Sequence, residues 1–306
     1  MGMIRSDGYD DETWLTGDPA VTCIIGMFYD SGKGAVVIAD SRTMIGGDYS
    51  HDRKLFEVDE GIVFAASGLS GIAGKLLANV ADSRQRSRQF LPSECINVFE
   101  DEMAELYNRY KMTKPFRFGA DETLLTGIIG FLEDEKPKLP KLYCLYENGY
   151  AEAVRNFHSV GHGARHASNI LRTLYTPSLS KERAIEIGVH ALIEVSKIDA
   201  MVDGSPQIAI LADGVSESGL TILNCNGDSF SFECPEIEKV KKKVEGIEQK
   251  RTQVFHLLID GKEEVKKKLD EALNEYEDAK SPKSGTRKRG ERAEIARGGT
   301  EAATAG

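Results

Sequence analysis

The stretch Val21-Thr22-Cys23-Ile24-Ile25-Gly26-Met27-Phe28-Tyr29-Asp30-Ser31-Gly32-Lys33-Gly34-Ala35-Val36-Val37-Ile38-Ala39 decides the fold. Two β-rich runs, 21–29 and 35–39, flank a five-residue loop of Asp, Ser, Gly and Lys that suits a hairpin. Both faces of each run are apolar, and strands of that kind must be covered on both sides. We therefore expect two antiparallel neighbours in a sheet that is covered on both faces.

Blocks of strands alternate with pairs of helices along the next 170 or so residues, as the hydrophobic period shows. This order predicts an α+β fold, specifically a four-layer α-β-β-α sandwich, followed by a long C-terminal helix. The further strands expected are 54–58, 62–66, 123–131, 141–146, 151–157, 207–211 and 219–223, and the expected helices are 72–80, 96–107, 165–175 and 181–198.

Composition divides the chain into four parts. Residues 1–21 are polar and acidic, typical of a leader or propeptide, and the sandwich occupies 22–234. Apolar residues near heptad spacing predict an amphipathic helical extension over 235–278, which either packs on its own domain or forms an oligomer contact. Residues 279–306 lack core-forming side chains, so a disordered tail is expected.

The overall charge and the cysteines restrict the class of protein. The 306 residues carry a net charge of −10, which argues against a nucleic-acid-binding surface, and no segment has the apolar length of a membrane span. Five widely spaced cysteines without a Cys-x-x-Cys pair are typical of reduced thiols. We expect a cytoplasmic protein that acts on peptides or unfolded proteins.

Thr22 is the candidate nucleophile. A threonine hydroxyl needs a base, and the free α-amine of an N-terminal threonine, with a pKa of about 7.7–8.0, can serve as one. That chemistry requires removal of residues 1–21. A nearby lysine would keep the amine neutral by like-charge repulsion, and Lys54 is the candidate for this role.

Asp40 and Arg42 would stand on one face of the second strand, beside the strand that starts at Thr22. Asp40 could hold the ammonium of Lys54, because a buried lysine without a partner tends to lose its charge. Gly68 lies where a strand is followed by a helix, and its backbone N–H could bind an oxyanion.

Taken together, six short motifs resemble the proteasome β-type family and its simpler bacterial relatives, which are N-terminal nucleophile hydrolases. The resemblance covers Thr22 to about Leu223. Its motifs are Thr22-Cys23-Ile24-Ile25-Gly26, Ala39-Asp40-Ser41-Arg42, Lys54-Leu55-Phe56, Ala66-Ser67-Gly68-Leu69, Val160-Gly161-His162-Gly163 and Asp199 before Ile208-Ala209-Ile210-Leu211.

The resemblance implies roles for these residues. Thr22 would be the nucleophile, Asp40 and Lys54 would tune it, Gly68 would supply the oxyanion N–H, and Asp199 would support the amine and the nucleophile. It also implies a homo-oligomeric ring, an ATPase unfoldase or assembly partner, and no cofactor.

The sequence departs from the family in three places. Val21 precedes Thr22, where family precursors usually have glycine, and a β-branched residue hinders the rearrangement of self-cleavage. His162 stands where the family typically has a serine that contacts the amine, so an imidazole would take over that support. The C-terminal extension is not part of the usual β-subunit.

Other motifs favour plainer interpretations. His158, His162 and His166 do not predict a metal site, because glycines interrupt any common helix and no carboxylate completes the set. The glycines of 68–75 do not match a phosphate-binding loop. Cys23 is expected to be a strand residue, since its use as nucleophile would require cleavage one residue later.

The sequence thus predicts a threonine peptidase that forms an acyl-enzyme on Thr22 after autocatalytic processing. Two alternatives stay open. One is an inactive structural or assembly subunit of the same fold, and the other is an N-terminal nucleophile amidase or peptide acyl-transferase.

Overall fold

The structure is a computed structural model that describes residues 22–45, 48–86, 94–113, 123–133, 136–214, 216, 219–223, 235–259, 267 and 271. Its chain divides into two compact units, Met1–Ile247 and Glu248–Gly306. The first unit contains the sheets and the helices that cover them. The predicted leader and tail lie outside the described residues, and so does most of the predicted extension beyond 259.

The first sheet contains the hairpin predicted from the opening stretch. Its five strands lie in the order β10-β1-β2-β11-β12, and every pairing is antiparallel. The hairpin places β1 in contact with both β10 and β2, as Cys23 pairs with Gly161 and Ile24 with Ala39. The strand bounds are β1 (Cys23–Tyr29), β2 (Gly34–Ala39), β10 (Phe157–Gly161), β11 (Gln207–Ala212) and β12 (Leu220–Leu223).

The second sheet also has five antiparallel strands, in sequence order from β5 to β9. A separate two-stranded hairpin, β3 with β4, follows β2. The bounds are β3 (Arg42–Ile45), β4 (Asp48–His51), β5 (Leu55–Asp59), β6 (Ile62–Gly68), β7 (Leu125–Leu132), β8 (Pro140–Leu145) and β9 (Ala151–Ala153).

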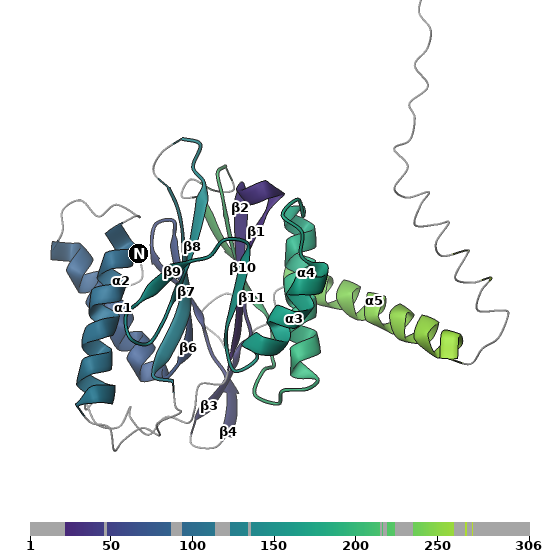
Figure 1. The fold of residues 1–306 in the computed structure, drawn as a ribbon, viewed down its shortest axis with the longest axis horizontal. Helices are drawn as coiled ribbons and strands as arrows, with labels where there is room; N and C mark the ends of the chain where they lie inside the picture. The colour runs from purple at the N-terminus through teal and green to yellow at the C-terminus, as the bar shows by residue number, and fades with distance from the viewer. Residues whose placement is uncertain are drawn as a thin grey trace, which may run out of the picture. The chain divides into compact units, whose positions relative to one another are not determined.

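Helices cover the outer face of each sheet (Figure 1). Leu76, Phe99 and Met103 from α1 and α2 join Phe64 of β6 in one buried cluster, while Leu171 and Leu192 from α3 and α4 join the core of the first sheet. The helices are α1 (Ser70–Arg86), α2 (Cys95–Tyr107) with the π-helical turn η4 (Asn108–Met112), α3 (Ala164–Leu174), α4 (Lys181–Ser196) and α5 (Pro235–Ile259).

A third buried cluster fills the space between the two sheets. Ile24 and Val37 from the first sheet meet Leu55, Val63 and Ile128 from the second. The strands of the opening hairpin are therefore buried on both faces, as their continuous apolar pattern predicts. The result is the α-β-β-α sandwich expected from the order of elements.

Two local expectations were wrong. The single strand predicted over 151–157 is two strands, β9 and β10, which belong to different sheets. The second strand ends at Ala39, so Asp40 follows it and Arg42 begins β3, and the two residues do not share a strand face. Of the helices described, none is long and apolar enough to cross a membrane.

Candidate active site

Thr22 lies directly before β1 and is almost fully buried, with 3% of its surface exposed. Its carbonyl oxygen accepts a hydrogen bond of 3.3 Å from the backbone N–H of Gly163. Its neighbour Cys23 pairs with Gly161 on β10. The loop between β10 and α3 therefore fixes the backbone of Thr22 from one side.

Lys54 approaches Thr22 from the second sheet. Its Nζ lies 2.6 Å from the Thr22 hydroxyl oxygen and 3.2 Å from Oδ1 of Asp40. All three side chains are buried, with 6% exposure for Lys54 and 2% for Asp40. The side chains of Thr22, Lys54 and Asp40, the predicted nucleophile and the two residues predicted to tune it, therefore lie in contact.

The carboxylate of Asp40 is held by backbone donors. The N–H of Cys23 donates to Oδ1 at 2.9 Å, and those of Arg42 and Asp203 donate to Oδ2 at 3.2 and 3.3 Å. Because these donors and Lys54 surround the carboxylate, its position is fixed with respect to the start of β1. Asp40 is therefore an anchor for Lys54.

Burial dominates the titration of this pair. It lowers the pKa of Lys54 below that of an ordinary lysine, although the charge of Asp40 opposes the shift. It raises the pKa of Asp40, opposed by Lys54 and by the backbone donors. A lysine of lowered pKa next to a hydroxyl group can exchange a proton with that hydroxyl more readily than a solvated lysine can.

Arg42, which was expected beside Asp40 on the second strand, has its side chain directed to the segment after α4. One guanidinium nitrogen donates to the carbonyl of Ala200, and Nη2 lies 2.5 Å from Oδ2 of Asp203. Its contribution to Asp40 comes from the backbone N–H. Arg42 therefore ties β3 to the loop that also supplies the Asp203 donor.

Asp199 follows α4, is 9% exposed, and contacts His162. Its Oδ2 lies 2.6 Å from Nδ1 of His162, and its Oδ1 accepts a hydrogen bond from the N–H of Met201 at 3.0 Å. The His162 side chain is 60% exposed, and its two flanking glycines contact Thr22 or its neighbour. An aspartate holding one ring nitrogen leaves the other available for proton transfer.

Two glycines in this region are required by their backbone conformation. Gly68 has φ +143°, and a Cβ there would lie 2.6 Å from the Leu124 carbonyl oxygen and from the Leu125 Cα. Gly161 has φ +92°, and a Cβ there would lie 2.4 Å from the carbonyl oxygen of Thr22 and 2.8 Å from Oγ of Ser67. A larger residue at Gly68 would displace the start of β7, and one at Gly161 would displace the backbone of Thr22.

Other predicted residues have simpler roles. Burial raises the pKa of the Cys23 thiol far above its usual value, so the thiolate needed for nucleophilic attack is disfavoured. His158 lies on β10 and His166 on α3. Val21 lies outside the described residues.

Sequence reasoning missed Gln207, the first residue of β11, which is 4% exposed. Its Oε1 accepts hydrogen bonds from the N–H groups of Lys54 at 2.9 Å and Leu55 at 3.1 Å, and its Nε2 donates to the Asp52 carbonyl at 2.7 Å. The amide thus links the first sheet to the segment that carries Lys54. The sequence feature that could have identified Gln207 is a polar amide side chain at the first position of an otherwise apolar strand.

Comparisons with known proteins concern the family and the fold of the chain. The family model for proteasome subunits matches residues 21–211, more than half of the chain. The chain belongs to the proteasome subunit family. The match begins one residue before Thr22 and ends in β11, so it includes all the candidate site residues and every strand of the two large sheets except β12.

Two solved structures share the fold. The Anbu protein from Yersinia bercovieri, described as an ancestral beta-subunit, has 15% sequence identity and a TM-score of 0.60, with 77% of this chain and 96% of that chain covered. The Anbu Gly-1 mutant from Hyphomicrobium sp. strain MC1 has 12% identity and a TM-score of 0.56, with 76% and 96% covered. At these identities the likeness concerns the fold.

Proposed function

We propose that this proteasome-family chain is a threonine peptidase in which Thr22 becomes the N-terminal residue and the nucleophile. The observation that carries this proposal is the 2.6 Å contact between Lys54 Nζ and the Thr22 hydroxyl, anchored by Asp40. A buried lysine is costly. A buried lysine in contact with a threonine hydroxyl serves a nucleophile, and an inactive subunit would have no use for this costly arrangement.

Processing comes first in this proposal. The Thr22 hydroxyl attacks the carbonyl carbon of Val21, and the amide bond to the Thr22 nitrogen breaks as an ester to the Thr22 oxygen forms. Water then hydrolyses the ester, which releases residues 1–21 as a carboxylic acid and leaves a free α-amine. Lys54 is the group in contact with the hydroxyl that can exchange its proton.

Peptide hydrolysis follows the same chemistry. The Thr22 oxygen attacks the scissile carbonyl while the α-amine accepts the hydroxyl proton, and the Gly68 N–H is proposed to donate to the oxyanion. Collapse of the intermediate expels the amine half of the peptide, which takes up the proton. Water then hydrolyses the acyl-enzyme and regenerates the hydroxyl.

His162 and Asp199 are proposed to support the freed amine. The 2.6 Å contact between them orients the imidazole on the loop whose glycines border Thr22. This arrangement replaces the serine hydroxyl that the family resemblance leads one to expect at the position of His162.

The subunits are further proposed to assemble as a homo-oligomeric ring in the cytoplasm. Their proposed substrates are peptides or unfolded proteins, and their proposed partner is an ATPase unfoldase.

The intact mass of the purified protein tests the processing step. We expect a chain that has lost residues 1–21, whereas Thr22→Ala should keep its full length. Cys23→Ala is the matched control, because it changes the adjacent residue and should still be processed. A wild-type chain of full mass that also fails to cleave peptides would support the inactive subunit instead.

Turnover then separates peptidase from acyl-transferase chemistry. Wild-type protein incubated with a peptide in ¹⁸O-labelled water should release two fragments, and the new carboxyl group of the acyl fragment should carry ¹⁸O. A product that joins the acyl fragment to an added peptide amine, without ¹⁸O uptake, would favour the acyl-transferase alternative.

A further inference from the structure

A cavity of about 670 Å³ opens beside the candidate active site, and the catalytic residues described above do not account for it. It lies among β7, the β8–β9 turn and β10, so its walls come from both sheets. Its twelve lining residues are Tyr107, Thr123, Thr126, Tyr146, Glu147, Asn148, Tyr150, Glu152, His158, Ser159, Val160 and Gly161.

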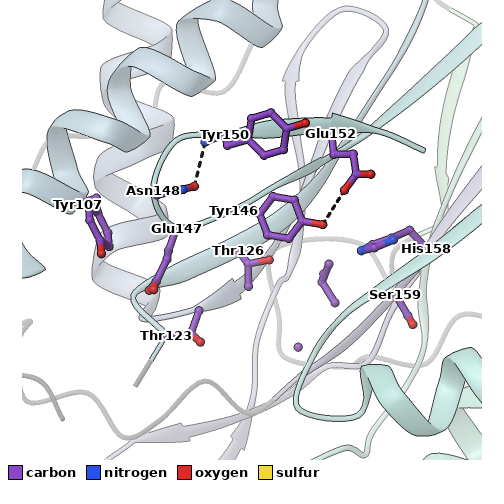
Figure 2. A pocket seen from close by; sticks show the side chains of 12 residues that line it. Tyr107, Thr123, Thr126, Tyr146, Glu147, Asn148, Tyr150, Glu152, His158 and Ser159 are labelled. Carbon is purple, nitrogen blue, oxygen red and sulfur yellow. Dashed lines mark hydrogen bonds between the residues drawn. The ribbon is translucent and has the colours of Figure 1, made fainter. Parts of the chain in front are cut away.

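One side of the cavity is an aromatic wall with a carboxylate at its edge (Figure 2). The rings of Tyr146 and Tyr150 stack with centroids 6.0 Å apart, and Tyr150 is 58% exposed. The Tyr146 hydroxyl donates to Oε2 of Glu152 at 3.0 Å. Stacked tyrosine rings next to a carboxylate attract cations through the ring faces and through charge.

The electrostatic character of the cavity is negative. None of its twelve lining residues is a lysine or arginine. Glu147 is neutralised by Lys111, whose Nζ lies 2.8 Å from its carboxylate, so the negative charge in the cavity rests with Glu152. Burial lowers the pKa of His158, which keeps its ring neutral near pH 7 and prevents it from repelling a cation.

The inner end of the cavity borders the Thr22 region. Gly161 lines the cavity, and a Cβ built on it would lie 2.4 Å from the Thr22 carbonyl oxygen, so the two residues are close neighbours. Thr126, another lining residue, pairs with Ser67, which precedes the proposed oxyanion donor Gly68. From Gly161 to His158, β10 advances by about 10 Å, which is the span of three extended peptide residues.

We propose that this cavity binds a basic side chain, arginine or lysine, of the peptide substrate at a position about three residues from the bond cut at Thr22. The ammonium or guanidinium group lies against the Tyr146 and Tyr150 rings and pairs with Glu152. The proposal rests on the proposed peptidase function, since it names the substrate class of the same site.

Binding of labelled peptides tests this inference without depending on turnover. The probes are fluorescein-labelled hexapeptides that differ at one position, which is arginine, norleucine or glutamate. They are titrated against the full wild-type chain and against Thr22→Ala, with fluorescence anisotropy as the readout. We expect the arginine peptide to bind about tenfold more tightly than the norleucine peptide, because a cation–π contact and a charge pair are added.

Glu152→Gln should reduce that preference to about twofold or less, since it removes the charge and keeps the shape. Glu60→Gln is the matched control, because Glu60 is an exposed glutamate in the turn between β5 and β6, on the far edge of the same sheet. It should leave the tenfold preference unchanged.

Equal binding of the arginine and norleucine peptides by both forms would overturn the inference, as would a preference that survives Glu152→Gln or a failure to bind any of the peptides. Peptide cleavage without a basic preference would sink the inference and leave the peptidase proposal standing. If the chain binds the arginine peptide preferentially but cleaves no peptide, the cavity assignment stands and the peptidase proposal fails.

Discussion

Gly161 is the residue whose replacement most directly disturbs Thr22. In Gly161→Ala, the new Cβ would lie 2.4 Å from the Thr22 carbonyl oxygen at a positive φ, so the backbone of Thr22 must shift. We expect kcat to fall at least about 100-fold, because small misplacements of reacting groups are costly. The measurement is the steady-state rate of peptide hydrolysis.

Gly74→Ala is the control for that variant, since a Cβ at Gly74 in α1 meets no atom within 4 Å. It should retain full activity and gain up to about 1 kcal/mol of stability from the higher helix propensity of alanine. Normal kinetics in Gly161→Ala would show that the β10–α3 loop does not position Thr22.

The Lys54–Asp40 pair predicts a non-additive effect on stability. Lys54→Met leaves the Asp40 carboxylate buried without its cation and should reduce the free energy of unfolding by about 3–5 kcal/mol. The double variant Lys54→Met/Asp40→Asn removes both charges and should recover part of that loss. Urea denaturation measures both values, and a double variant less stable than Lys54→Met would contradict the account.

The members of the candidate site are predictable from the sequence as far as residue order and residue type determine them. Thr22, Asp40 and Lys54 were selected together, and their side chains lie in contact. Arg42 was assigned to the same strand face as Asp40, but the chain leaves the strand after Ala39 and redirects the guanidinium toward Asp203. A turn of this kind depends on tertiary partners that spacing does not reveal.

Strand β11 positions the segment before β5 through a single side chain, that of Gln207. Gln207→Met keeps the volume of Gln207 but removes its three hydrogen bonds to residues 52–55. We expect a loss of about 2–4 kcal/mol from the unsatisfied backbone groups and a fall in kcat of at least tenfold, with little change in KM.

Thr221→Val serves as its control, because it likewise exchanges a polar for an apolar side chain, and Thr221 is a half-buried residue of the neighbouring strand β12. Its kcat should match wild type. If Gln207→Met raised KM and left kcat unchanged, Gln207 would be acting on substrate binding and not on Lys54.

The elements themselves were predictable where their patterns are long. The buried hairpin of β1 and β2 and the helix pairs follow from hydrophobic periodicity, because both sheets and helices bury continuous apolar surface. The division of 151–157 into β9 and β10 was not, since the chain passes from one sheet to the other without a glycine or proline to mark the change. The short β3–β4 hairpin lacks an apolar alternation, and the only sequence signal for it is the dipeptide Gly46-Gly47 between its strands, which is typical of two-residue hairpin loops.

Buried cysteine thiols make the free energy of unfolding decrease as the pH rises into the alkaline range. Burial raises the pKa of Cys95 to about 12 and of Cys144 to about 11, whereas an unfolded cysteine titrates near 8.5. The folded state therefore keeps protons that the unfolded state loses. This contribution is fully present below pH 8.5 and declines as the pH rises above it.

Urea denaturation at pH 7.5 and pH 10 measures that effect. We expect Cys95 alone to account for about 1–2 kcal/mol of the stability lost between these pH values. Cys95→Ala is less stable at pH 7.5 but should lose that much less on going to pH 10. An identical drop in both proteins would mean that the thiol of Cys95 titrates normally in the fold.

The proposed function requires that Thr22 becomes an N-terminal nucleophile. Tandem mass spectrometry of protein treated with an epoxyketone electrophile tests it most directly, since such a reagent needs a hydroxyl and a free α-amine on one residue. We predict one adduct, located on Thr22 at the N-terminus of a chain that lacks residues 1–21. An unmodified chain that retains Val21 before Thr22 would contradict the claim.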